Sequence, residues 1–383
     1  MSKSVLAPPL PSSGAADRVG SSAIRDLLHL TERPEVISLA GGLPSPEGFP
    51  VAALARATAE ILDHDPTAAL QYTTTEGLPM LRAWVDEDPD RVVITHGSQQ
   101  ALDLLVRATV RPGDTIALAD PGYVGALQVF RLADARLAGI PADGDGLRVD
   151  VLADRLAEGL RPTLVYVVPE FDNPSGVTLS EERRRALADL SDRYGFLIVA
   201  DDPYGALRWR GEAPTPLADL TDQVVTLGTA SKVLTPGLRV GWANAPKDLT
   251  RDLVVLKQAA DLHTSSLSQQ LAAALLTDLS FLQPHLERLR SRYEAQCDAL
   301  VEALAPLPLT FHQPDGGMFL WAEADRPTQP LLERALAEGV AFVPGEAFSV
   351  DDPHEHGLRL SFATASPAQL AEAARRLARA LSA

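Results

Sequence analysis

The sequence contains a single cysteine, Cys297, and only four lysines against thirty arginines. One cysteine excludes an intramolecular disulfide and a cysteine-rich zinc site, so we expect a soluble protein of a reducing, cytoplasmic compartment. The first residues lack the apolar core of a signal peptide, and no apolar run approaches the roughly 20 residues of a membrane helix. Chemistry that requires a primary amine has few candidates, which are Lys3, Lys232, Lys247 and Lys257.

An excess of positive charge is also absent, because the formal net charge is −17. Nucleic acids and anionic membranes both bind through basic patches, so we expect neither as a partner. A small anionic ligand is still compatible with this balance, since a few local cations can dominate one pocket. The length of 383 residues exceeds one ordinary core and predicts two closely packed domains.

The middle of the chain alternates short apolar runs with amphipathic stretches. Strands separated by helices predict an α/β fold with a mainly parallel sheet and helices on both faces. We expect strands at residues 92–95, 115–120, 163–169, 196–202, 223–229 and 238–245, and helices at 98–110 and 180–194.

The pattern changes after residue 246 and predicts a smaller α+β unit at the C-terminal end. It is helical as far as residue 302. We then expect a strand at 319–321, a helix at 330–338, a strand at 357–362, and a solvated amphipathic helix at 367–381.

A lysine stands just past one of these strands, in Gly228-Thr229-Ala230-Ser231-Lys232. A side chain at this place projects into the crevice where open α/β sheets bind ligands. The hydroxyls of Thr229 and Ser231 suit a phosphate, and Arg239 can add a charge-assisted contact. A solvated turn lysine is the alternative interpretation.

Two adjacent carboxylates, Asp201 and Asp202, end another strand. They can bind a metal, cap a turn or pair with a cation, and no histidine at ligand spacing supports the metal. A carboxylate that faces the nitrogen of a pyridine ring would keep that nitrogen protonated, and the ring would then accept electrons from a reacting substrate. A second acidic group, Asp351 and Asp352 with His354 and His356, is interpreted as a solvated loop.

Three further features follow or lie within strands. The turn His96-Gly97-Ser98-Gln99 begins a helix and is either an anion site or a plain helix start. Asn173 belongs to an Asn-Pro-Ser-Gly turn, which is common in loops. Arg359 lies in the middle of an apolar strand and needs an anionic partner, such as a substrate carboxylate.

Taken in order, these motifs resemble the fold-type I pyridoxal 5′-phosphate (PLP) enzymes, specifically the class I/II aminotransferases. The resemblance runs from about Ser38 to Phe362 and is most similar to the branch that handles 2-aminoadipate, kynurenine, branched-chain and aromatic amino acids. It implies a large domain with a seven-stranded-type sheet and a smaller α+β domain. It rests on SLAGGLPSPEGFP, QYTTTEGLPMLR, HGSQQALDLL, DPGYVGALQVF, VPEFDNPSGVTLS, ADDPYGALRW, GTASKVLTPGLRVGW, DGGMFLW and GLRLSF, with IRDLL and LHTSSLSQQ pointing to the branch.

The resemblance implies a role for each cofactor-binding residue. Lys232 would bind PLP covalently and carry a proton, and Asp201 would pair with the pyridine nitrogen. Tyr204 and Asn173 would hydrogen-bond the 3′-oxygen, and Tyr123 would stack on the ring. The phosphate would be held by Ser98, Gln99, Thr229, Ser231 and Arg239. His96 departs from the family, where a small residue is common.

The resemblance also implies a homodimer with shared active sites, in which Tyr72 reaches the phosphate of the neighbouring subunit. Gly42, Asn173 and Arg359 would place the substrate α-carboxylate. Glutamate and 2-oxoglutarate, as one substrate pair, would need a second cation for the distal carboxylate. Arg25 is the candidate, and a surface arginine paired with an acidic neighbour is the alternative.

We therefore expect an aminotransferase that moves an amino group between an L-amino acid and a 2-oxo acid. The alternative is a PLP enzyme of the same fold that performs elimination, decarboxylation, cyclisation or oxidation on a special amino acid. The expected domains are a flexible leader (1–20), an N-terminal segment that covers the active site (21–50), a large PLP-binding domain (51–280) and a small domain (281–383).

Overall fold

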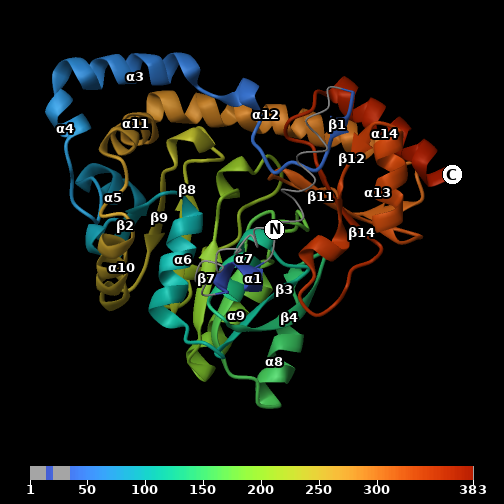
Figure 1. Ribbon diagram of the computed structural model, residues 1–383, viewed down its shortest axis with the longest axis horizontal. Helices are drawn as coiled ribbons and strands as arrows, with labels where there is room; N and C mark the ends of the chain where they lie inside the picture. Colours follow the sequence, from blue (N-terminus) through green and yellow to red (C-terminus); the bar gives the residue numbers. More distant parts are fainter. Residues whose placement is uncertain (1–13, 20–34, 383) are drawn as a thin grey trace, which may run out of the picture.

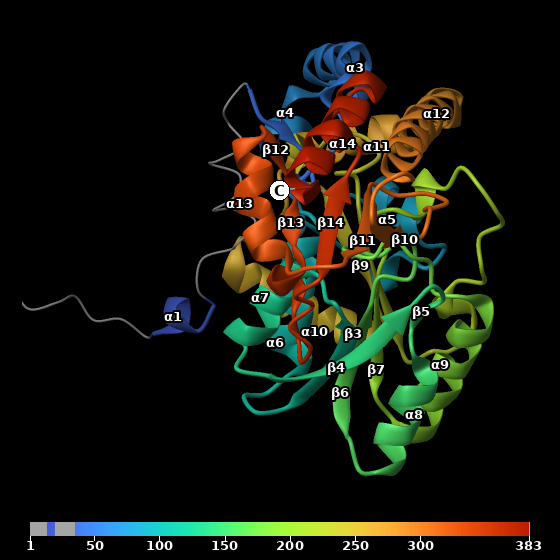
Figure 2. The same cartoon turned by 90° about the vertical axis from the view of Figure 1, so that its right-hand side faces the viewer.

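The computed structural model describes residues 14–19 and 35–382 of the chain. An eight-stranded sheet flanked by helices forms the larger part, and a four-stranded sheet with helices α12–α14 forms the smaller part. Figure 1 shows the smaller part to one side of the large sheet, and Figure 2 shows strands β11 and β14 with helices α13 and α14 above it.

The large sheet has the strand order β2–β9–β8–β7–β6–β3–β4–β5. The neighbouring strands β8, β7, β6, β3 and β4 are parallel to one another. Strand β9 is antiparallel to both β2 and β8, so the sheet is mixed with a parallel centre. The sequence did not predict β4 or the two-residue β5. The strands are β2 (Val92–Thr95), β3 (Thr115–Asp120), β4 (Arg136–Asp143), β5 (Gly146–Leu147), β6 (Pro162–Val167), β7 (Leu197–Asp201), β8 (Val224–Thr229) and β9 (Gly241–Asn244).

Side chains on the central strands alternate between two hydrophobic cores, because successive residues of a strand point to opposite faces. Ile116 and Leu118 belong to the core on the side of α6 and α7, whereas Ala117 belongs to the core on the side of α8 and α9. Helices therefore cover both faces, as predicted. They are α6 (Ser98–Thr109), α7 (Val124–Leu132), α8 (Val149–Ala157), α9 (Glu181–Tyr194) and α10 (Lys247–Ala260).

The parallel strands β3, β6, β7 and β8 end at one edge of the sheet, and the predicted site residues follow them. Tyr123 comes after β3, Asn173 after β6, Asp201 at the end of β7 and Lys232 after β8. Parallel strands place these chain positions together because their carboxyl ends coincide.

The smaller sheet has the order β10–β11–β14–β13 and is antiparallel. Its strands are β10 (Leu309–Phe311), β11 (Phe319–Ala324), β13 (Val343–Pro344) and β14 (Gly357–Ser361). Its helices are α12 (Leu279–Leu304), α13 (Thr328–Ala337) and α14 (Pro367–Ser382). Arg359 lies in the middle of β14.

Helix α14 corrects one expectation, because it is not simply a solvated helix. It packs against α12 and α13 and buries Leu370, Ala373, Leu377 and Leu381. These residues recur at helical spacing and form one apolar stripe, so the helix closes the core of the smaller part.

The described N-terminal residues contact both parts of the molecule. Helix α1 (Ala15–Val19) contacts α7, and β1 (Ile37–Ser38) pairs in parallel with β12 (Val340–Ala341). Helix α11 (Ser266–Leu276) contacts α3 (Val51–His64), α4 (Pro66–Leu70) and α5 (Pro79–Val85), beside the β2 edge of the large sheet. Among the residues that the structure describes, no helix is both long and apolar enough to span a membrane.

Candidate active site

A cavity of about 270 Å³ lies at the edge where the parallel strands end. It contains most of the predicted site residues. A larger cavity of about 820 Å³, lined among others by Arg155, His312 and Trp321, contains none of them. The smaller cavity is lined by Gly42, Ser98, Gln99, Tyr123, Asn173, Asp201, Tyr204, Thr229, Ser231, Lys232, Arg239 and Arg359, together with Gly97, Val168, Pro203 and Pro236.

Lys232 projects into this cavity, and its Nζ donates a hydrogen bond to the carbonyl oxygen of Gly42 at 3.2 Å. Burial, with smaller contributions from Arg239 and Arg359, lowers the pKa of Lys232 to about 8, against the opposing effect of Asp201. More of the amine is therefore uncharged near neutral pH than for an exposed lysine, and the uncharged amine is the nucleophilic form.

Asp201 presents one carboxylate oxygen without a partner. Its Oδ2 accepts a hydrogen bond from the hydroxyl of Tyr166 at 2.9 Å, whereas its buried Oδ1 has no hydrogen-bond partner. Burial is the main cause that raises the pKa of Asp201 to about 7. A buried carboxylate beside a cavity is stabilised by a cationic N–H donor, so the site fits a protonated pyridine nitrogen.

The neighbouring Asp202 has a different environment. Its Oδ1 accepts hydrogen bonds from the backbone N–H groups of Tyr204 at 3.2 Å and Gly205 at 2.7 Å. Asp202 therefore caps the turn after β7 and leaves Asp201 to face the cavity. Among residues 14–19 and 35–382, no group of histidine, cysteine and acidic side chains is arranged to hold a metal ion.

Hydroxyls, a helix start and one guanidinium gather at another wall of the cavity. Ser98 and Gln99 begin α6, and the Thr229 hydroxyl donates to Ser231 Oγ at 2.9 Å. Arg239 Nη2 donates to the carbonyl oxygen of His96 at 3.1 Å. These are the groups that bind phosphate in proteins, so this wall fits the phosphate of PLP.

Arg359 is a buried cation, only 1% exposed, whose hydrogen-bond acceptors are neutral. Its Nη1 donates to Asn173 Oδ1 at 2.8 Å and its Nη2 to the carbonyl oxygen of Ala40 at 2.6 Å, while Nε has no partner. The guanidinium carbon lies 4.5 Å from the ring centroid of Phe319. Burial lowers the pKa of Arg359 to about 10. A buried guanidinium with a spare donor is ready to receive a carboxylate.

Two tyrosines complete the walls. Burial raises the pKa of Tyr123 to about 12, and it also raises the pKa of Tyr204, which is hydrogen-bonded to Asn173. Both phenols therefore remain protonated near neutral pH and can donate hydrogen bonds.

One predicted residue, Tyr72, does not line the cavity of this chain, and another cannot be placed. Tyr72 is 77% exposed, and its ring makes an edge contact with His263 at 5.5 Å between centroids. Arg25 lies outside the described residues.

Sequence reasoning missed Tyr166 and misjudged His354. Tyr166 lies within a predicted apolar strand, and the signal that could identify it is that a lone phenol in such a run needs a partner when buried. His354 is not in a wholly solvated loop, since its Nε2 lies 2.7 Å from Oδ1 of the buried Asp120. Asp120 also accepts the backbone N–H groups of Val350, Asp351 and Asp352. The contact ties this loop of the smaller part to the end of β3.

The chain is similar to known proteins over almost its whole length. Residues 34–377 match the family described as aminotransferase class I and II. A 2-aminoadipate transaminase from Thermus thermophilus is 42% identical over 382 residues, which cover 96% of this chain and 95% of the relative. An aromatic-amino-acid aminotransferase from Thermococcus litoralis is 40% identical over 379 residues, which cover 94% of this chain and 91% of the relative.

A solved structure agrees at the level of the whole fold. The crystal structure of an α-aminoadipate aminotransferase from Thermus thermophilus, complexed with N-(5′-phosphopyridoxyl)-L-leucine, has a TM-score of 0.90 and 40% identity, and the match covers 97% of both chains. The chain therefore belongs to the class I and II aminotransferases, PLP-dependent enzymes of fold type I, in the branch that contains the 2-aminoadipate, aromatic-amino-acid and kynurenine aminotransferases.

Proposed function

We propose that this aminotransferase uses glutamate and 2-oxoglutarate as one of its substrate pairs and a second amino acid as the other. The single observation that carries the site assignment is the unpaired Oδ1 of Asp201 in the cavity that also contains Lys232. The names of the relatives support the substrate class, because 2-aminoadipate, like glutamate, carries a distal carboxylate.

Lys232 is the residue that binds the cofactor covalently and carries a proton during the reaction. Its pKa of about 8 places the amine close to the range in which it both accepts and releases a proton near neutral pH. PLP, when bound, supplies a ring that accommodates the electron pair left when the substrate loses its Cα proton. Asp201 would keep the ring nitrogen protonated through Oδ1, which has no partner in the protein.

The remaining cavity residues orient the reacting groups. Asn173 Oδ1 accepts from Arg359, so its amide nitrogen is the part that can donate to the cofactor's 3′-oxygen, beside the hydroxyl of Tyr204. Tyr123 would cover one face of the ring. The phosphate would be held by Ser98, Gln99, Thr229, Ser231 and Arg239, which line the same cavity.

Arg359 binds the α-carboxylate of the substrate, near Gly42 and Asn173. Among the described residues it forms no salt bridge, and it is held by two neutral oxygens. A bidentate carboxylate would neutralise this buried charge, and its geometry matches the planar guanidinium. Arg25 is the proposed contact for the distal carboxylate of glutamate.

We further propose a homodimer in which Tyr72 contacts the phosphate of the neighbouring subunit. Large apolar side chains stand exposed beside Tyr72, since Leu70 (69% exposed) precedes it by two residues and Leu262 (46% exposed) adjoins His263, whose ring contacts Tyr72. Apolar surface of this kind, gathered around a predicted shared residue, favours burial against a second copy.

A screen of single amino acids against the purified holoenzyme tests the substrate proposal. Glutamate should convert the cofactor to its aminated form and release about one 2-oxoglutarate per active site without an added acceptor. Release of ammonia or carbon dioxide instead would support elimination or decarboxylation. If apolar donors react and glutamate does not, the proposed pair is wrong.

A further inference from the structure

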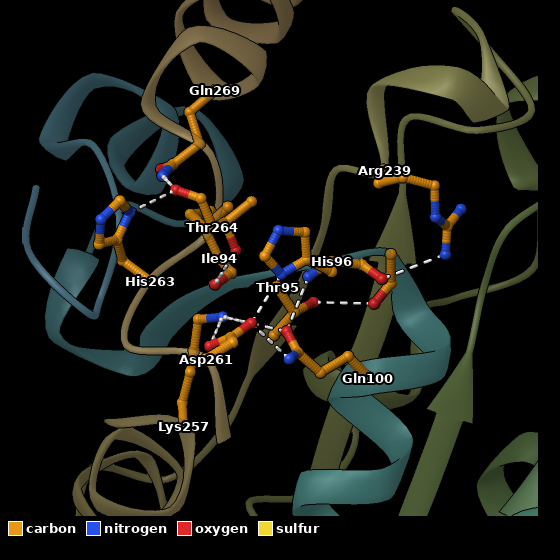
Figure 3. A network of polar contacts seen from close by, with 11 residues as sticks. Ile94, Thr95, His96, Gln100, Arg239, Lys257, Asp261, His263, Thr264 and Gln269 are labelled. Carbon is orange, nitrogen blue, oxygen red and sulfur yellow. Dashed lines mark hydrogen bonds and ion pairs between the residues drawn. The ribbon is translucent and has the colours of Figure 1, made fainter. Parts of the chain in front are cut away.

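A partly buried polar network lies beside the turn that begins α6, and the proposed chemistry does not use it (Figure 3). Lys257 of α10 is 0% exposed, and its Nζ donates to Gln100 Oε1 at 3.0 Å and to Asp261 Oδ1 at 2.9 Å. Asp261 Oδ2 accepts from Gln100 Nε2 at 2.6 Å and lies 2.6 Å from His96 Nδ1. The four side chains thus form one closed cluster.

Burying the charged amine of Lys257 costs free energy, so its position requires an explanation. Burial is the first cause that lowers the pKa of Lys257, and the contacts with Asp261 oppose it. A buried lysine is tolerated when a carboxylate and further hydrogen bonds replace its water. Lys247, by contrast, is exposed and pairs with Asp88. Lys257 therefore does not contribute to the charged surface as Lys247 does, and its role must lie in the contacts that it makes inside the protein.

The network holds the main chain of the turn. Gln100 Oε1 accepts the backbone N–H of His96 at 2.8 Å, and the carbonyl oxygen of His96 accepts from Arg239 Nη2 at 3.1 Å. Gly97 has φ +75°, and a Cβ there would lie 2.6 Å from Arg239 Nη2, so the guanidinium packs directly on the turn. Asp261 contacts the side chain of His96, and the main chain of His96 contacts Gln100 and Arg239, so the cluster links the helix start to Arg239.

The same segment anchors a second part of the proposed cofactor site. The hydroxyl of Thr264 donates to the carbonyl oxygen of Ile94 at 3.1 Å, on the strand that leads into the turn. Gln269 Oε1 accepts the backbone N–H of Leu78 at 2.8 Å, and Ser266 Oγ donates to Gln71 O at 2.7 Å. Residues 257–269 thus connect the turn to the segment that carries Tyr72.

We propose that His96, Gln100, Lys257 and Asp261 are positioning residues that hold the turn 96–99 and the guanidinium of Arg239 in the geometry that binds the cofactor phosphate. The inference rests on the proposed phosphate site. It assigns His96 a role that a small residue cannot perform, because only a longer side chain with a donor nitrogen reaches the carboxylate of Asp261.

The test compares His96→Ala with the conservative His96→Asn, which retains a side-chain N–H. Apoenzyme is titrated with PLP and, separately, with pyridoxal, which bonds to Lys232 but has no phosphate. Binding is followed by cofactor absorbance and tryptophan fluorescence. His96→Ala should weaken PLP about five- to twentyfold and leave pyridoxal within about twofold, and His96→Asn should recover most of the loss.

A second variant removes the charge at the centre of the network. Asp261→Asn should also weaken PLP more than pyridoxal, whereas the matched control Asp88→Asn, in the exposed pair with Lys247, should leave both affinities unchanged. Thermal unfolding of each apoenzyme reports whether the variant folds. If Asp261→Asn does not fold, the PLP and pyridoxal affinities of the two His96 variants decide whether the inference holds.

Two results would overturn the inference. Unchanged PLP affinity in His96→Ala would show that the turn needs no such support, and equal losses for PLP and pyridoxal would show a general structural role. Arg239→Gln separates this inference from the proposed phosphate site. If Arg239→Gln weakens PLP and His96→Ala does not, only the inference fails, and if neither variant weakens PLP, the phosphate site is wrong as well.

Discussion

The hydrogen bond from Tyr166 to Asp201 permits a quantitative prediction. Replacing Tyr166 with Phe removes a donor at 2.9 Å from a carboxylate that is 4% exposed. A buried hydrogen bond to a charged group contributes about 1.5–3 kcal/mol, and one pKa unit corresponds to about 1.4 kcal/mol. Because the hydrogen bond favours the ionised carboxylate, its loss should raise the pKa of Asp201 by roughly one to two units.

The sign of the effect on activity follows from the role of Asp201 as a carboxylate. Protonation of Asp201 removes the partner of the ring nitrogen, so the acid limb of kcat/KM should move to higher pH by about one to two units in Tyr166→Phe. The assay is a pH profile of the half-reaction with a single amino donor.

Tyr194→Phe is the matched control, because Tyr194 ends α9 before β7 begins, whereas Asp201 lies at the other end of β7, and the Tyr194 ring contacts Arg161 and Arg193. Its acid limb should not move. An unchanged acid limb in Tyr166→Phe would refute the reasoning. A uniform loss at every pH would show that the hydroxyl supports packing and not the ionisation of Asp201.

Three further predictions concern the proposed roles. Lys232→Ala should abolish transamination, and borohydride reduction of the wild-type holoenzyme should place the cofactor on Lys232, which peptide mapping checks. Asp201→Ala should still bind PLP but lose Cα proton removal by orders of magnitude in single-turnover assays, and a near-normal rate would mean that Asp202 takes its place. Arg25→Ala should lower kcat/KM for glutamate by roughly ten- to a hundredfold and leave leucine nearly unchanged. Equal losses for both donors would indicate a structural role.

Strand positions on the central sheet could be predicted because their signal is local. The apolar run before Lys232 and the run before Asp201 are bounded by turn residues, and β2 and β3 were predicted to the residue. Strand β4 was missed since Gly139 and Pro141 interrupt its short apolar run. The antiparallel direction of β9 has no local signal, because a short apolar run reads the same in either direction.

Site residues could be predicted where they directly follow strands. Hydrogen-bond partners that come from distant parts of the chain could not. Lys232 and Asp201 each stand at a strand end with a recognisable motif. Tyr166 and Lys257 looked unremarkable in the sequence, since a tyrosine in a strand and a lysine in a helix are common, and His96 stood out only as a departure from the family. The distant partners are separated by 35 residues for Tyr166 and Asp201, by 165 for His96 and Asp261, and by 157 for Lys257 and Gln100.

The sequence by itself determined the elements and the chemical groups available to the site, because hydrophobic period, turn residues and the scarcity of lysine are properties of the chain. Tertiary structure alone decided which carboxylate faces the cavity, with Asp201 turned inward and Asp202 capping a turn. It also decided that Lys257 is buried beside Asp261 and Gln100. The physical reason is that burial and the identity of hydrogen-bond partners arise only when segments distant in the chain pack together, and these two conditions govern the pKa of each group.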